Sequence, residues 1–440
     1  MMQGTSAARK PYLAAQLRRY WPRAEEAVLH LGIPAAPADE PEPLPPRLAI
    51  VALPEWAGDL GVDGGLLVPR QFVIPGPEEI WHRVDWWAAT YWYLNGVAER
   101  AHEQAHGPVH SYSFRLKGWD ARLWERAWVN RIALFLRRWA ARERQQEEEK
   151  LFGPLPTAEV VLTHDVDAVR KTFAIRCKQS VFLALRALSS LVRGQPVQAG
   201  ARLGRAAGFF FGPGSYWNFD RVAEREHARG LRGHFNFYAG GGGWARAPSG
   251  LLFDPGYDVA EARLAAQIRD LHARGWTIGL HQSFNAWSDP AAMRLEKERL
   301  EESLGAAVTS CRQHWLRFGW ERTWRAQQEA GILLDTTLGF NDRPGFRNGA
   351  ALEFHPWDPE AGGPLRLAAL PMVLMDSHLY DYAELSEDAR LREMRRWIDE
   401  TSVVGGQMCV IWHQHALADD YGWDAGFEAF VGMLAESRPA

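Results

Sequence analysis

From residue 151 onward the chain alternates short apolar runs with amphipathic helical segments, and this alternation restricts the fold more than any other feature. Strands are predicted at 159–164, 233–238, 276–281, 308–314, 332–337, 366–374 and 407–413. Helices are predicted between them, among others at 258–274, 290–304, 320–330 and 386–400. Strands that alternate with helices favour a parallel sheet or a closed barrel, so we expect an α/β fold of roughly seven βα units.

The first 150 residues follow a different pattern and are expected to form a smaller, mainly helical α/β domain. A proline-rich stretch at 37–48 leads into one short apolar run, and amphipathic helices are predicted at 84–106 and 119–147. The second helical segment ends in RERQQEEEK, which is typical of a solvated helix end and a domain boundary. The predicted domains are therefore 1–150 and 151–440. The first could serve as scaffold, oligomerisation surface or carrier-recognition domain.

Composition restricts the class of protein. A formal net charge of -4 over 440 residues gives no sign of nucleic-acid binding. Three cysteines are too few and too scattered for a disulfide framework or a cysteine-type zinc site, and they favour a reducing compartment. The first residues do not resemble a secretory signal, and no window approaches the ~18 apolar residues needed to span a bilayer. We expect a cytoplasmic protein without a membrane span, and its oligomeric state stays open.

Ionisable side chains end five of the predicted strands. The stretch AEVVLTHDVD finishes an apolar run with Asp165 and Asp167, which period-two alternation places on one face. The other predicted strand ends carry His281, Arg312 with His314, Asp335, and His413. Active-site residues lie at the carboxyl ends of the strands in such folds. We therefore expect these side chains to lie together at that end of the barrel, its mouth. Taken alone, the aspartate pair would be better explained as a helix cap or a solvated turn, because aspartate is common at such junctions.

Aspartate and histidine at neighbouring strand ends suit a divalent cation, most simply Zn²⁺, with Mn²⁺, Co²⁺ or Fe²⁺ as alternatives. His314 could complete a ligand set with Asp167 and His281 that leaves positions open for water and substrate. The alternative is that His314 packs beneath Trp315 and Phe318.

The remaining strand-end groups suggest proton transfer. Asp165 could accept a proton from water, and Arg312 could hold that carboxylate ionised through charge-assisted hydrogen bonds. Asp335 could in turn fix Arg312, and His413 could protonate a leaving amine. These parts together predict metal-assisted hydrolysis of an amide or an ester.

Residues 158–415 resemble the polysaccharide deacetylase superfamily, also called the NodB-homology or carbohydrate esterase 4 superfamily. The matching motifs, in order, are THDVD, GLHQSFN, RQHWLRF, DTTLGFNDRPGFRNG, ALPMVLMDSHL and VIWHQH. The resemblance is closest to a branch with an N-terminal extension that is often found with surface-polysaccharide biosynthesis genes. It implies a distorted (β/α)7 barrel and one divalent metal, usually zinc.

The resemblance also implies roles, position by position: Asp165 as catalytic base, Asp167 and His281 as metal ligands, Arg312 as the base-orienting arginine and His413 as catalytic acid. The chain departs from the family pattern in two places. Asn285 stands where the second motif usually ends in histidine, and one residue separates two acids that are usually adjacent. We expect His314 to supply the missing nitrogen ligand.

The leading hypothesis is a metal-dependent N-deacetylase acting on an N-acylated sugar or glycan precursor. Substrate contacts are predicted at Asn285, Trp315, Arg343 and Arg347, and further sugar-stacking walls at Phe284, Trp287 and Trp357. The two arginines could instead support their glycine-containing loop. A glycine- and phenylalanine-rich stretch, 194–218, is predicted to form a mobile lid loop. Two alternatives stay open: a degenerate barrel that binds a glycan without hydrolysis, and a deacylase of a non-sugar amide or ester.

Overall fold

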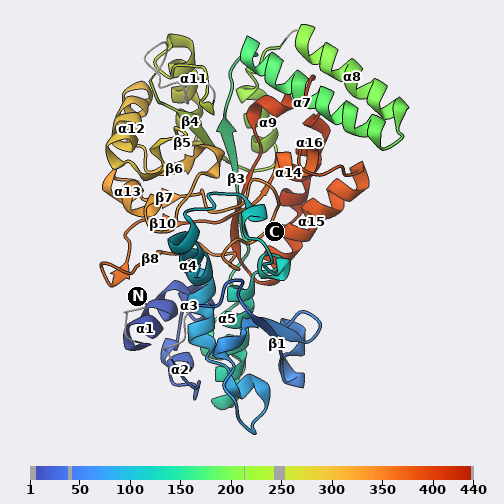
Figure 1. The fold of residues 1–440 in the computed structure, drawn as a ribbon. Coiled ribbons are helices and arrows are strands. Elements are labelled where there is room, and N and C mark those ends of the chain that lie inside the picture. Colours follow the sequence, from blue (N-terminus) through green and yellow to red (C-terminus); the bar gives the residue numbers. More distant parts are fainter. Residues whose placement is uncertain (1–5, 38–41, 213, 242–252, 438–440) are drawn as a thin grey trace.

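The larger part of the molecule is built on one parallel sheet, shown in Figure 1. The structure is a computed structural model that describes residues 6–37, 42–212, 214–241 and 253–437, so residues 38–41 of the predicted linker lie outside the described residues. The strands follow the order β10-β7-β6-β5-β4-β3-β12-β11. Their bounds are β3 (Glu159–Val166), β4 (His234–Tyr238), β5 (Thr277–Gln282), β6 (Ser310–Gln313), β7 (Leu334–Asp335), β10 (Ala368–Ala369), β11 (Met372–Met375) and β12 (Gln407–Ile411).

The two edge segments, β10 and β11, belong to one pass of the chain and join the two ends of the sheet. β10 pairs with β7 on one side, and β11 pairs with β12 on the other. Between them, Leu370 N donates to Asp335 O (2.8 Å), and Pro371 O accepts from Cys409 N (3.0 Å). Seven strand positions therefore close into a ring, each at a predicted strand. The predicted fold class, a distorted (β/α) barrel, is confirmed.

Helices surround the sheet, as Figure 1 shows. They are α9 (Phe219–His227), α11 (Ala262–Ala273), α12 (Pro290–Leu304), α13 (Thr323–Glu329), α14 (Asp376–Tyr380), α15 (Glu387–Val403) and α16 (Asp424–Glu436). Two begin at side-chain caps. Asp289 accepts hydrogen bonds from the backbone N–H groups of Ala291 and Ala292, and Ser386 accepts one from Ala389. Among the described residues, no helix is both long enough and apolar enough to cross a membrane.

The N-terminal segment consists of α1 (Ser6–Gln16), α2 (Glu25–Leu29), a β1 (Leu48–Ala52) and β2 (Gly65–Pro69) hairpin, α3 (Trp86–Leu94), α4 (Val97–His106), α5 (Trp128–Glu143) and α6 (Glu148–Phe152). The single helix predicted at 84–106 is two helices. Gly96 separates them with a φ of 57°, a conformation that a side chain disfavours, and a Cβ there would collide with Trp320.

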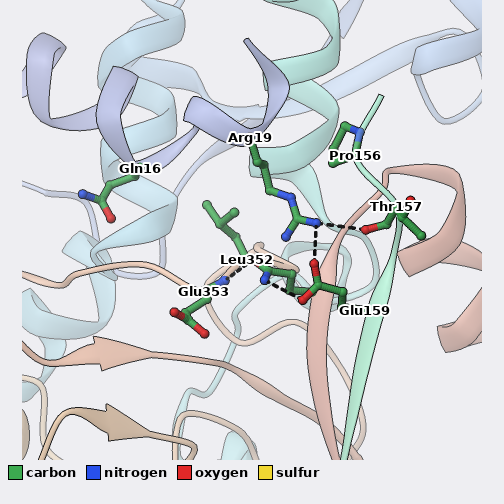
Figure 2. A pocket seen from close by; sticks show the side chains of 8 residues that line it. Gln16, Arg19, Pro156, Thr157, Glu159, Leu352 and Glu353 are labelled. Carbon is green, nitrogen blue, oxygen red and sulfur yellow. Dashed lines mark hydrogen bonds and ion pairs between the residues drawn. The ribbon is translucent and has the colours of Figure 1, made fainter. Parts of the chain in front are cut away.

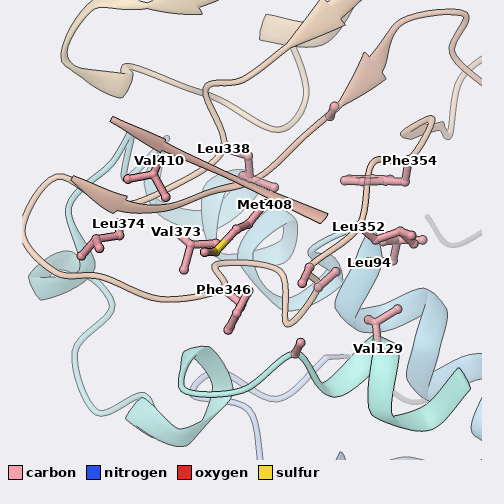
Figure 3. Close-up of a cluster of buried hydrophobic side chains, with 14 of the residues drawn as sticks. Leu94, Val129, Leu338, Phe346, Leu352, Phe354, Val373, Leu374, Met408 and Val410 are labelled. Carbon is pink, nitrogen blue, oxygen red and sulfur yellow. The ribbon is translucent and has the colours of Figure 1, made fainter. Parts of the chain in front are cut away.

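Apolar side chains of the N-terminal segment and of the barrel pack against each other. Figure 3 shows Leu94 and Val129 close to Phe346, Leu352 and Phe354 within one cluster of buried residues. Backbone contacts cross the same boundary, since Val129 N donates to Gly349 O at 2.8 Å. The domain limits 1–150 and 151–440 stay a prediction.

A helical hairpin, α7 (Phe173–Val192) and α8 (Pro196–Phe211), is inserted between β3 and β4. The prediction of a mobile lid loop at 194–218 is wrong for most of that stretch, because its residues 196–211 are helical. Ala206 of α8 is buried at the contact with α7, whereas Gly200, Gly204 and Gly208 are exposed and face open space. Leu183 of α7 packs against Ala206 and Phe209 of α8 in a small buried cluster. Tertiary packing of this face outweighs the loop propensity of the glycines.

Candidate active site

The polar side chains at the end of strand β3 point alternately to its two faces. Thr163 and Asp165 are buried on the face that points into the ring, and Asp167 follows just past the end of the strand. His164 points the other way. Its Nε2 lies 2.8 Å from Glu226 Oε1 on α9, and its Nδ1 lies 2.7 Å from Trp412 O. The two predicted acids therefore share the inner face, while His164 joins the strand to its surroundings.

Asp167, His281 and His314 converge at the end of the sheet. One ligand atom from each residue lies within 4.8 Å of the others. Asp167 Oδ1 is 3.3 Å from His281 Nε2 and 3.6 Å from His314 Nε2. His281 is the fifth residue of β5, and His314 comes directly after β6, so neighbouring parallel strands bring the two rings together. Asn285 is not part of this group; its Oδ1 accepts a hydrogen bond from Arg317 at 2.9 Å.

The remaining hydrogen bonds of the two rings show that this group fits a cation. His281 Nδ1 lies 3.1 Å from the Arg312 carbonyl, which can only accept, so Nδ1 carries a proton and Nε2 is the nitrogen that faces Asp167. His314 Nδ1 is oriented in the same way by Asp254 Oδ1 at 3.2 Å. Asp167 Oδ1 is buried and accepts no hydrogen bond of normal geometry from the described residues. With Nε2 unprotonated on both rings, these side chains would offer a cation two nitrogen ligands and one oxygen ligand.

The pKa shifts agree with this need for positive charge. Burial raises the pKa of Asp167, but His281, His413 and His314 outweigh it and hold the pKa well below the usual value. Burial lowers the pKa of His281, yet Asp165 and Asp167 raise it overall. The mouth therefore favours an ionised Asp167 facing a cationic partner.

Asp165 is held by two neighbouring strands. Asn236 on β4 donates to Asp165 Oδ1 at 2.8 Å, and Arg312 Nη1 on β6 lies 3.9 Å from Oδ2. Burial raises the pKa of this carboxyl, but Arg312, His281 and His413 lower it below its ordinary value, so Asp165 is ionised at neutral pH. Gly279 faces Asn236 across the sheet, and a Cβ there would collide with the Asn236 side chain.

Arg312 is fully buried and oriented by hydroxyl groups. Its Nη2 donates to Thr163 Oγ1 at 2.9 Å, and its Nε donates to Thr336 Oγ1 at 3.0 Å. The prediction that Asp335 fixes Arg312 is wrong. Asp335 instead accepts hydrogen bonds from Trp324 (2.9 Å), Gln327 (3.0 Å) and Thr337. Asp335 precedes Thr336 by one residue, and period-two alternation turns it to the helix-covered face.

His413, directly after β12 and Trp412, completes the mouth on the side opposite β5. Its Nδ1 lies 2.8 Å from Asp376 Oδ1, and its backbone N–H donates to Asp376 Oδ2 at 2.7 Å. Its Nε2 is 3.6 Å from Asp167 Oδ2. Burial lowers the pKa of His413, but Asp376 and the two mouth aspartates raise it to about 10. The side chain is therefore protonated at neutral pH and able to act as an acid.

The predicted substrate contacts divide into two groups. Trp315 adjoins His314 with ring centroids 6.1 Å apart, and Arg343 lies over the Trp124 ring at 4.9 Å. Arg347 is buried in an ion pair with Glu99, so the prediction that it binds substrate is wrong. Trp357 is also buried, with its ring centroid 5.0 Å from that of Tyr12, which removes it as a stacking wall. A buried guanidinium needs a buried carboxylate, and only the folded chain supplies one.

Three residues of the site were missed at the level of sequence: Asn236, Asp254 and Asp376. Asn236 is the one amide in the apolar run GHFNFY, and Asp376 lies two residues after a predicted strand inside a matching motif. Either residue could therefore have been chosen as a candidate from its position in the sequence. Asp254 reaches His314 from a loop outside any predicted strand, so nothing in its local sequence pointed to it.

A surface hollow of about 540 Å³ lies elsewhere, between the N-terminal segment and the barrel. Figure 2 shows its lining, with Arg19 donating to Thr157 O (3.0 Å) and to Glu159 (3.4 Å). Glu159 begins β3, whereas Asp165 and Asp167 lie at the other end of that strand. The hollow is therefore separate from the strand-end cluster.

Three solved structures that resemble this one can be compared with it. No family model matches this sequence, and the search of curated proteins found no match. A protein from Mycobacterium smegmatis assigned as a polysaccharide deacetylase is 19% identical, with a TM-score of 0.37 over 64% of this chain and 84% of its own. A polysaccharide deacetylase from Bacillus cereus is 11% identical, with a TM-score of 0.29 over 63% and 88%. A family 4 carbohydrate esterase from Streptomyces lividans, in complex with acetate, is 10% identical, with a TM-score of 0.29 over 64% and 87%. These names are those of the superfamily that the motifs resemble.

Proposed function

We propose that this protein is a metal-dependent hydrolase that removes an acyl group, most simply N-acetyl, from a sugar or glycan precursor. The observation that carries the proposal is the group of Asp167, His281 and His314 beside an ionised Asp165 and a protonated His413. The motif resemblance supplies the class of substrate.

The residues of the mouth divide the reaction between them. A divalent cation held by Asp167, His281 and His314, for which Zn²⁺ fits the donor set best, would act as a Lewis acid that favours ionisation of water and polarises the acyl oxygen. Asp165, held by Asn236 and attracted by Arg312, accepts the proton of the attacking water.

His413 acts at the other end of the bond that breaks. Its protonated Nε2 donates to the leaving nitrogen as the carbon–nitrogen bond breaks, and the products are a carboxylate and an amine. Asp376 stabilises the imidazolium and fixes the ring, because it accepts from both Nδ1 and the backbone N–H of the same residue. The base thus comes from β3 and the acid from the segment that follows the neighbouring strand β12.

The test measures metal content and acetate release from N-acetylated sugar oligomers in the same preparations. We expect Asp165→Asn to retain the metal and to lose at least about 100-fold in kcat, since a general base contributes this order of rate. We expect His281→Ala and His314→Ala to lose the metal and the activity together. Asn285→Ala, at the position where the family motif has histidine, is the matched control and should retain the metal.

Unchanged acetate release in both Asp165→Asn and His281→Ala would contradict the proposal. A wild-type protein that binds the glycan but neither binds metal nor releases acetate would instead establish a degenerate, binding-only barrel. Retention of metal in His314→Ala but not in Asn285→Ala would reverse the assignment of the third ligand.

A further inference from the structure

Exposed apolar side chains are concentrated on the α7–α8 hairpin. Nine of the seventeen exposed large apolar residues in the described part of the chain lie on these two helices. On α7, Val181, Leu185, Leu188 and Val192 follow helical spacing along one face, and each is between 58% and 83% exposed. This face points away from the helix pair's own contact, where Leu183 packs against α8.

The outward surface of α8 continues this apolar face. Val197 and Phe211, near its two ends, are 85% and 83% exposed. Between them the exposed positions include Gly200, Gly204 and Gly208, which carry no polar side chain. In Figure 1 the two helices lie side by side at the periphery of the molecule, far from α1 to α5. A contiguous apolar surface of this kind marks an interaction site.

The charge of the hairpin indicates what it contacts. Residues 168–219 contain eight arginine and lysine residues and no aspartate or glutamate, in a chain whose net charge is -4. Acidic residues outside the hairpin neutralise part of this positive charge. Lys171 pairs with Asp420 (2.6 Å), and Arg193 and Arg202 share the single carboxylate of Glu384 (3.3 and 2.8 Å). Positive charge therefore remains in excess around an apolar face.

We propose that the α7–α8 hairpin docks this protein on an anionic phospholipid bilayer. An apolar helix face bordered by basic residues is the pattern of helices that lie in the membrane interface. Neither helix qualifies as a membrane span, which fits a position in the plane of the interface. A second copy of the chain is a less favourable partner for this apolar face, because it would place one basic hairpin against another.

The position of the hairpin connects this surface to the active site. Phe173 begins α7 only a few residues after Asp167, so the hairpin leaves the barrel at the end of β3 that carries the two aspartates. A bridge between Arg170 and Ser215 and the ion pair of Lys171 with Asp420 fasten its base to the body. Docking would hold the mouth beside the membrane surface. The proposal does not depend on the proposed reaction.

The experiment is co-sedimentation of the full-length protein with vesicles of phosphatidylcholine, with or without phosphatidylglycerol. We expect binding to the anionic vesicles, weakened by high salt. The triple variant Leu185→Ser, Leu188→Ser, Val192→Ser should bind at least about tenfold more weakly, because it removes buried apolar area. Its matched control changes three exposed apolar residues elsewhere, Leu295→Ser, Leu333→Ser and Val403→Ser, and should bind like wild type.

A second variant, Arg193→Gln with Arg205→Gln, leaves the apolar face intact and tests the charge separately. We expect about a thirtyfold loss of binding to anionic vesicles from the two removed charges. Absence of wild-type binding, or equal binding by the triple variant and its control, would overturn the proposal. So would a dimer in solution that the triple variant dissociates, since this face would then be a contact between copies. Vesicle binding is measured without substrate, so its result does not depend on whether the protein catalyses the proposed reaction.

Discussion

The three histidines at the mouth share one arrangement and differ in what orients them. Each Nδ1 faces an oxygen, and each Nε2 faces a carboxylate oxygen of Asp167. A backbone carbonyl orients His281, whereas carboxylates orient His314 and His413. Burial lowers the pKa of both His314 and His413, and at His314 it outweighs the nearby carboxylates. At His413 the charge of Asp376, with those of Asp167 and Asp165, outweighs burial and raises the pKa to about 10.

The Asp376→Asn variant tests this at the residue scale. Asp376 raises the pKa of His413 toward about 10, so the acid is protonated below that pH and loses its proton above it. Without the negative charge the pKa falls, and we expect the alkaline limb of the kcat/KM profile to move to lower pH. A profile measured over the alkaline range checks this, with Asp419→Asn, at an exposed acid of the neighbouring loop, as control. An unmoved alkaline limb would exclude His413 as the acid.

Among the elements, helix α12 fixes the loop that follows β5. Glu296 is buried, and both its oxygens accept from Ser283, one from the backbone N–H at 3.0 Å and one from the hydroxyl. Ser283 is two residues beyond His281, so this contact holds the chain where it leaves the candidate metal group. Burial raises the pKa of Glu296 to about 7.

The raised pKa of Glu296 should make the free energy of unfolding of the protein depend on pH. Between pH 4.5, the ordinary pKa of this carboxyl, and about 7, the native protein keeps a proton that the unfolded chain has lost, so the free energy of unfolding falls as the pH rises through this window. We expect Glu296→Gln to remove up to about 3 kcal/mol of this fall. Urea unfolding at pH 5 and pH 8 measures it. Glu298→Gln, exposed on the same helix, is the matched control, and an equal fall in both variants would contradict the prediction.

Element prediction succeeded where local pattern and tertiary packing agree. The strands of the ring all coincide with predicted strands, and most of them are apolar because a parallel strand is buried on both faces. The prediction at 194–218 failed because glycine and phenylalanine are typical of a lid loop, whereas Ala206 and Phe209 pack against Leu183 of α7 and stabilise a helix there. The predicted helix at 84–106 failed at Gly96, where the turn follows from a contact with Trp320.

At the scale of the whole molecule, ion pairs buried between distant segments join the N-terminal segment to the barrel. Arg347 pairs with Glu99 on α4, and its Nη1 donates to Gly339 O at 2.8 Å. Arg131 on α5 pairs in the same way with Glu400 on α15 at 2.8 Å. Both pairs have little exposed side-chain surface, so neither segment could lose its partner without leaving a buried charge.

Arg347→Met tests this connection. It leaves Glu99 buried without its partner, and we expect a loss of about 3–5 kcal/mol in the free energy of unfolding. The double variant Glu99→Gln with Arg347→Met removes both charges and should lose less than the single one. Chemical denaturation measures both, and we expect one transition for the whole chain. Equal stability of the single variant and wild type would contradict the structural role of this pair.

The amino-acid pattern alone predicted the succession of strands and helices in the barrel, the inner face that Asp165 and Asp167 share, and the strand ends that carry His281, Arg312, His314 and His413. These features follow from local periodicity, which needs no knowledge of distant segments. The folded chain was needed to find that Asp335 and Arg347 are structural, that Asn236, Asp254 and Asp376 orient the mouth, and that α7 and α8 present an apolar face. Those outcomes depend on which residues meet across the folded chain, because burial and hydrogen-bond partners are set by packing between segments far apart in sequence.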